Sequence, residues 1–123
     1  MKTGFLIVAH APLGQALYDV ADTILGGLKD CAVVDVDSDA PSEVILSQLR
    51  SARDSLQCER IIVLEDILFA TPSNRVKEAF GTEYPVIAPL SLPMLLKLVN
   101  YRNGDLETLV AKAREIQTTF ITE

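Results

Sequence analysis

The chain has 123 residues, of which 49% are hydrophobic and 23% charged, as expected for one compact domain over residues 1–123. Its 11 Lys and Arg residues against 17 Asp and Glu residues give a net charge of -6. This balance argues against nucleic acid or an anionic membrane surface as a partner, because both attract clustered basic side chains. The chain contains a single histidine, His10.

The cysteines and the apolar segments predict a cytoplasmic protein that is not inserted into a membrane. Cys31 and Cys58 lack Cys-x-x-Cys spacing, so we interpret them as small buried hydrophobic residues in a reducing compartment. The apolar run over residues 5–9 is too short for a secretory signal. The most apolar stretch, residues 85–96, contains three prolines and falls short of the roughly 20 residues that span a bilayer.

Predicted strands and helices alternate from the start of the chain. Residues 4–10 form a continuous apolar run that is typical of a strand covered on both faces. Residues 12–26 are predicted to form an amphipathic helix, with Pro12 in its first turn. Its apolar stripe consists of Leu13, Ala16, Leu17, Val20, Ala21, Ile24 and Leu25. A strand over residues 31–36 and a helix from Ser42 to about Leu56 repeat this unit.

The second half of the chain continues the alternation. Strands are predicted over residues 60–65 and 86–88, and helices over residues 71–80, 91–99 and 106–116. Thr71 and Pro72 have the residue types of an N-cap and a first helical position. The tail over residues 118–122 is rich in β-type residues and is interpreted as a final edge strand.

This order predicts an α/β fold with a doubly wound, mainly parallel sheet of flavodoxin-like strand order and helices on both faces. Ligands of such sheets bind beyond the carboxyl ends of the strands. Residues 10–12, 66–74 and 89–91 are expected to converge there, and each segment leads into a helix start. Because helix N-termini favour anions, this convergence predicts phosphate chemistry.

His10 and Asp66 are the candidate catalytic residues. His10 is either a nucleophile or a histidine that ends its strand and bonds to a backbone carbonyl. Asp66 follows the third strand, where its carboxylate can accept the imidazole N–H and free the other ring nitrogen. An isolated Asp would instead be read as a capping or loop residue. Glu65 is expected on the opposite side of the strand and receives no role.

Thr71 and Asn74 are the candidate phosphate-binding residues. Thr71 can cap its helix and also donate its hydroxyl to a phosphoryl oxygen, whereas Asn74 either contacts the ligand or holds the loop in shape. No metal or other cofactor is predicted. Asp35, Asp37 and Asp39 are interpreted as a solvated acidic loop, and no glycine-rich nucleotide motif is present.

Three motifs occur in register along the chain. They are Ile7-Val-Ala-His10, Val63-Leu-Glu-Asp66 followed by Thr71-Pro-Ser-Asn74, and Ser91-Leu-Pro-Met-Leu-Leu96. In order and spacing they resemble the EIIA domain of the mannose family of the bacterial sugar phosphotransferase system, over essentially the whole chain. The sequence departs from that family at Ala11, where the family has Gly, and at Phe69-Ala70, where it has Gly-Gly. Phe69 is expected to reshape the mouth at which a partner docks.

The resemblance implies a phosphotransferase activity without metal or nucleotide. His10 would accept a phosphoryl group from the phosphohistidine of the carrier HPr, Asp66 would be its hydrogen-bonded partner, and Thr71 would contact the phosphoryl group. The acceptor would be a IIB component, which phosphorylates a sugar during uptake. The resemblance also implies a homodimer that exchanges a C-terminal strand, a part for which residues 118–122 are suited.

Two other functions stay open on the sequence. The first is a regulatory sensor of phosphorylation state, in which His10 is phosphorylated in an incomplete phosphotransferase system and no sugar is transported. The second is a receiver-like domain with Asp66 as the phosphate acceptor. A receiver would need an acidic pair after the first strand to hold Mg²⁺, and Val8-Ala9-His10 supplies none.

Overall fold

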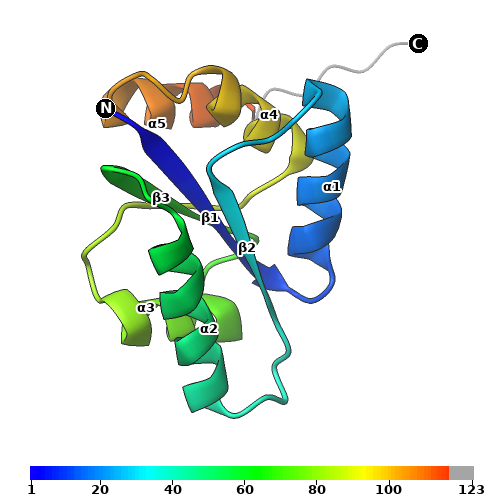
Figure 1. Ribbon diagram of the computed structural model, residues 1–123, viewed down its shortest axis with the longest axis vertical. Coiled ribbons are helices and arrows are strands. Elements are labelled where there is room, and N and C mark those ends of the chain that lie inside the picture. Colours follow the sequence, from blue (N-terminus) through cyan, green and yellow to red (C-terminus); the bar gives the residue numbers. More distant parts are fainter. Residues whose placement is uncertain (117–123) are drawn as a thin grey trace.

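Four parallel strands form one sheet in the order β2-β1-β3-β4 (Figure 1). The strands are β1 (Thr3–His10), β2 (Cys31–Val36), β3 (Arg60–Glu65) and β4 (Val86–Ile87). The computed structural model describes residues 1–116. The predicted doubly wound, flavodoxin-like order is confirmed, and the strand order changes direction between β1 and β3.

The helices lie on both sides of this sheet. They are α1 (Leu13–Leu25), α2 (Ser42–Ser55), α3 (Thr71–Phe80), α4 (Leu92–Asn100) and α5 (Leu106–Glu115). Figure 1 shows α1, α4 and α5 on one face and α2 and α3 on the other. In residues 1–116, no helix combines the length and apolar character that crossing a bilayer requires. The predicted strand over residues 118–122 lies outside the described residues.

The central strand β1 is buried on both faces, which explains its continuous apolar run. Phe5 and Ile7 pack toward α1, α4 and α5, whereas Leu6 and Val8 pack toward α2 and α3. None of these four side chains is exposed to solvent. Burial on this scale stabilises the fold by roughly 1.5–3 kcal/mol for each large apolar side chain. It also fixes the position of His10 at the end of the strand.

Helix α1 buries less of its apolar stripe than the sequence predicts. Ala21 is fully buried, but Leu13, Val20 and Ile24 are 42%, 45% and 57% exposed. The helix packs on β1 and β2 and has α4 as its neighbouring helix. The apolar stripe of α1 is therefore wider than the surface that β1, β2 and α4 cover.

Candidate active site

The ends of β1 and β3 bring His10 and Asp66 together. The two strands are hydrogen-bonded neighbours, with Val8 opposite Glu65. Because they are parallel, both strands end at the same edge of the sheet. This edge lies where the strand order reverses, the usual ligand-binding position of a doubly wound sheet. The sequence prediction of this convergence is confirmed.

Asp66 holds His10 by two contacts. Its Oδ2 atom accepts a hydrogen bond from the His10 backbone N–H at 2.9 Å and lies 2.7 Å from Nδ1 of the imidazole. Its Oδ1 atom accepts a third hydrogen bond, from the Ile67 N–H at 2.9 Å. The side chain of Asp66 is 8% exposed, against 39% for that of His10. The histidine ring thus reaches solvent while its partner is buried.

These contacts define the tautomer of the ring. Burial by itself would raise the pKa of Asp66, but the hydrogen bonds from His10 and Ile67 outweigh it and lower the pKa below its ordinary value. An ionised carboxylate can only accept hydrogen bonds, so Nδ1 carries the ring hydrogen. In the neutral ring, Nε2 is then the nitrogen with a free lone pair. This arrangement suits a nucleophile.

Asp66 itself is poorly suited to accept a phosphoryl group. Both of its oxygens already accept hydrogen bonds, and the side chain is almost entirely buried. Transfer to this carboxylate would break those bonds and leave the His10 ring without its partner. The geometry therefore disfavours the receiver-like alternative.

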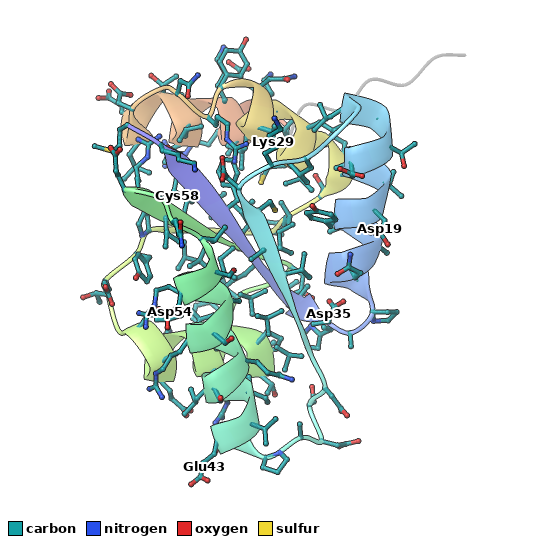
Figure 2. The ribbon with its side chains drawn as sticks, in the orientation of Figure 1. Asp19, Lys29, Asp35, Glu43, Asp54 and Cys58 are labelled. Atoms are coloured by element: carbon teal, nitrogen blue, oxygen red, sulfur yellow. The ribbon has the colours of Figure 1, made fainter. Side chains whose placement is uncertain are left out.

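The carboxylate of Asp35, a residue of β2, binds the start of α1, and the sequence did not predict this contact. Its Oδ1 accepts a hydrogen bond from the Gly14 N–H at 2.7 Å, and its Oδ2 accepts one from the Gln15 N–H at 2.9 Å. Figure 2 shows Asp35 on β2, beside the start of α1. A Cβ atom at Gly14 would lie 2.6 Å from Oδ1, so the glycine permits this close approach.

The interpretation of Asp35 as part of a solvated loop is therefore wrong. It lies in β2 and faces a helix, and the sequence signal was an acidic residue inside an otherwise apolar strand. Because its carboxylate already bonds to the first N–H groups of α1, it opposes a second anion at that helix start. Of the three helix starts predicted to favour an anion, those of α3 and α4 therefore remain.

The starts of α3 and α4 differ in whether a side chain caps them. The Oγ atom of Ser91 caps α4 by accepting a hydrogen bond from the Met94 N–H at 3.3 Å. Helix α3 has Ala70 as its N-cap residue and no side-chain cap. The prediction of Thr71 as N-cap is wrong by one position, because the chain is still extended at Ala70 and Thr71 is the first helical residue. The start of α3 therefore leaves the N–H groups of Thr71 and Ser73 open to an anion, whereas Pro72 has no N–H.

Thr71 and Asn74 both lie in the first turn of α3. Thr71 is half-buried and Asn74 is exposed. The backbone N–H of Asn74 donates to the Ala70 carbonyl at 2.9 Å, the first hydrogen bond of the helix. Within residues 1–116, neither side chain forms a hydrogen bond with His10 or Asp66. Their suitability for phosphate thus depends on their place at the open helix start.

A match to a known protein family identifies the relatives of this chain. The EIIA-man model, described as PTS system fructose IIA component, matches residues 4–117. The chain belongs to this family. Membership supports a phosphocarrier role in the phosphotransferase system (PTS) for this EIIA-man chain.

Solved structures share the fold of this EIIA-man chain. The PTS IIA protein associated with the fucose utilization operon of Streptococcus pneumoniae has a TM-score of 0.83 at 16% identity, over 97% of this chain and 93% of that chain. The mannose/sorbose-specific IIA subunit of Enterococcus faecalis has a TM-score of 0.81 at 22% identity, over 100% and 98%. EIIA of Streptococcus agalactiae has a TM-score of 0.76 at 23% identity, over 96% and 97%. Among curated proteins, none matches the sequence.

An exposed apolar loop begins immediately after Asp66 in the EIIA-man chain. Ile67, Leu68 and Phe69 are 50%, 47% and 84% exposed. Phe69 has a φ angle of 62°, in the left-handed region, and its ring centroid lies 5.6 Å from Nζ of Lys77. The loop therefore presents an exposed aromatic ring three residues after Asp66 in the chain.

Three cavities within residues 1–116 are lined by neither His10 nor Asp66. The cavity between β2 and α2 has a volume of about 560 Å³ and is lined by Asp35 and by serines of α2. Neither His10 nor Asp66 lines it. Transfer between two proteins requires an accessible ring nitrogen rather than a closed pocket, so the exposed edge of the sheet is the better site for this chemistry.

Proposed function

We propose that this EIIA-man protein is a cytoplasmic phosphoryl carrier of the sugar phosphotransferase system. Its His10 accepts a phosphoryl group from the phosphohistidine of HPr and passes it to a IIB component for sugar uptake. The observation that carries the proposal is the 2.7 Å contact between Asp66 Oδ2 and Nδ1 of His10, which leaves Nε2 as the free nitrogen of a partly exposed ring.

The proposed step is an in-line transfer between two imidazoles. Nε2 of His10 attacks the phosphorus atom, a new N–P bond forms, and the N–P bond of the donor breaks as its imidazole leaves with the electron pair. The ring of His10 gains positive charge, which the ionised carboxylate of Asp66 stabilises. Transfer to the IIB component repeats these events with His10 as the donor.

The open start of α3 is the proposed cradle for the phosphoryl oxygens. Helix α3 has no side-chain cap, so the N–H groups of Thr71 and Ser73 are available to an anion. Pro72 has no N–H, and the Asn74 N–H already bonds to the Ala70 carbonyl. The hydroxyl of Thr71 and the amide of Asn74 are the proposed side-chain contacts, because both residues lie in that turn. Asp35 blocks the same role at α1.

The partner surface is proposed to include the apolar loop over residues 67–69. This loop follows Asp66 directly and exposes the ring of Phe69, a residue type common at the centres of protein interfaces. The net charge of -6 favours a basic carrier surface as the docking partner. We also propose a homodimer with exchange of residues 118–122, on the resemblance alone.

Phosphorylation in a reconstituted system tests this function. The protein is incubated with labelled phosphoenolpyruvate, enzyme I and HPr, and the label is then challenged with acid and with alkali. Because the chain has a single histidine, an acid-labile and alkali-stable label that disappears in His10→Ala places the phosphoryl group on His10. A label that persists in His10→Ala contradicts the proposal.

Two further measurements separate the parts of the proposal. Addition of a purified IIB component should discharge the label from the protein, whereas a label that stays in place would favour the regulatory sensor. Sedimentation at micromolar concentration should give a dimer, and a monomer would contradict strand exchange.

A further inference from the structure

A second cavity lies on the face of the sheet that α2 and α3 cover. It is formed by the end of β3, α3, the loop that follows α3, and β4. Its volume is about 450 Å³. The wall is mostly apolar, with side chains from Leu68, Val76, Tyr84 and Val86, and its polar groups include Glu65 and Ser73. Neither His10 nor Asp66 lines it, although Leu68 of the apolar loop and Ser73 of the first turn of α3 border both this cavity and the proposed phosphoryl-transfer site.

The alternation of β3 directs Glu65 into this cavity. Ile61 and Val63 pack toward α2 and α3, and Glu65 follows them on the same side of the strand. Its side chain is only 1% exposed, and within residues 1–116 its Oε1 atom has no hydrogen-bond partner. Buried polar atoms in folded proteins are nearly always satisfied, so an unpartnered oxygen on a residue that lines a cavity indicates a missing donor.

The neighbouring groups satisfy this carboxyl only in part. Burial raises the pKa of Glu65, and a hydrogen bond from the Ser73 hydroxyl lowers it by a smaller amount, but Oε1 keeps no partner within residues 1–116. Lys77 also lines the cavity, but its effect on the Glu65 carboxyl is the weakest of those that act on it. The ammonium group of Lys77 instead lies 5.6 Å from the ring centroid of Phe69. A cation that reached Glu65 would replace the hydration that the carboxylate loses on burial.

We propose that this cavity binds a small organic amine, whose protonated amino group donates to Oε1 of Glu65 and whose apolar body packs against Leu68, Val76 and Val86. An anionic ligand would be repelled by the carboxyl group. A polyhydroxylated sugar would leave most of its hydroxyls without partners against this apolar wall. Binding involves no phosphoryl group and no part of His10, so this activity is additional to the carrier function.

Titration of the full chain with 2-phenylethylamine at near-neutral pH tests the proposal. Calorimetry should show saturable one-to-one binding, and the backbone amide signals of Ser73 and Thr82 should shift in NMR spectra. Glu65→Gln should weaken binding about tenfold or more, because a charge-assisted hydrogen bond is lost. The matched control is Glu83→Gln, which removes an exposed carboxylate from the loop after α3. This variant should bind the amine as the wild type does.

Two additional measurements keep the test decisive. Val86→Trp changes a residue that is 42% exposed, and it should abolish binding by filling the cavity while the circular dichroism spectrum is unchanged. 2-Phenylethanol, which has a similar body without the cation, should bind about tenfold more weakly or worse.

Absence of saturable binding to the wild type overturns the proposal. Unchanged affinity in Glu65→Gln, or equal affinity for the alcohol, does the same. His10→Ala should retain the amine, so loss of phosphorylation and loss of this site are distinguishable.

Discussion

Oδ2 of Asp66 accepts two hydrogen bonds from His10, one from the backbone N–H at 2.9 Å and one from Nδ1 at 2.7 Å. One oxygen atom therefore holds both the end of β1 and the orientation of the imidazole. Because the two residues terminate neighbouring strands of a buried sheet, the pair is already ordered before any partner arrives. Such preorganisation reduces the entropy lost when the reacting groups meet.

The first prediction concerns this pair. Asp66→Asn should slow phosphoryl transfer from phospho-HPr by about 100-fold or more, because an amide cannot both hold the Nδ1 hydrogen and stabilise the charge on the ring. Initial rates with labelled phospho-HPr measure the effect, and a thermal melt checks the fold. Asp19→Asn, on the exposed surface of α1, is the matched control and should transfer at the wild-type rate. A wild-type rate in Asp66→Asn would refute the orienting role.

A second prediction concerns the helix cap made by Asp35. Asp35→Ala should lower the free energy of unfolding by about 0.5–2 kcal/mol, because the N–H groups of Gly14 and Gln15 lose their acceptors. Urea denaturation measures the change. Asp39→Ala removes an exposed carboxylate from the adjoining loop and should change stability by less than about 0.5 kcal/mol. Equal effects of the two substitutions would show that the cap contributes nothing.

The order of the sheet and the position of the edge that carries the candidate site could be predicted from the sequence. A continuous apolar run such as residues 4–10 indicates a strand buried on both faces, and alternation with helices implies parallel strands. Parallel strands end at one edge, which suffices to bring His10 close to Asp66. Helix ends were also predictable, since Pro and Gly mark them through backbone geometry.

The contacts of individual acidic residues could not be predicted in the same way. Whether Asp35 meets solvent or a helix start depends on how α1 lies against β2, and periodicity does not define that distance. The direction of Glu65 followed from strand alternation, but its missing partner depends on the packing of α3 around it. The exposure of Leu13 and Ile24 likewise reflects what α1 has beside it rather than its own sequence.

The third prediction gives Glu65 a pH signature. Burial holds the pKa of its carboxyl above the ordinary 4.5, so the folded protein disfavours the ionised form that the unfolded chain adopts freely. Wild-type stability should therefore fall, relative to Glu65→Met, as pH rises from about 4.5 toward the raised pKa. At about pH 7 the substitution should stabilise the protein by about 1–3 kcal/mol, and at about pH 4 by much less. Denaturation at both pH values measures this difference.

Glu83→Met is the control for that experiment. Glu83 is exposed, so its replacement should change stability by a small amount that does not depend on pH. If Glu65→Met gave the same change at both pH values, the effect would come from packing and not from the buried charge.

The fourth prediction separates the backbone conformation of Phe69 from its side chain. Phe69 has a φ angle of 62°, which costs about 1–2 kcal/mol for a residue with a Cβ atom and little for glycine. Phe69→Gly should therefore be more stable than Phe69→Ala by about 1 kcal/mol. Both variants lose the ring and its contact with Lys77, so this loss cancels in the comparison. Urea denaturation of the pair measures the difference, and equal stabilities would show that the loop relaxes away from this conformation.

The same two variants test the docking role of the ring. If the exposed ring of Phe69 contacts the phosphoryl donor, both variants should raise the KM for phospho-HPr to a similar extent and change kcat little, because His10 and Asp66 are untouched. A KM that rises only in Phe69→Gly would instead assign the effect to the flexibility of the loop. An unchanged KM in both would exclude Phe69 from the donor interface.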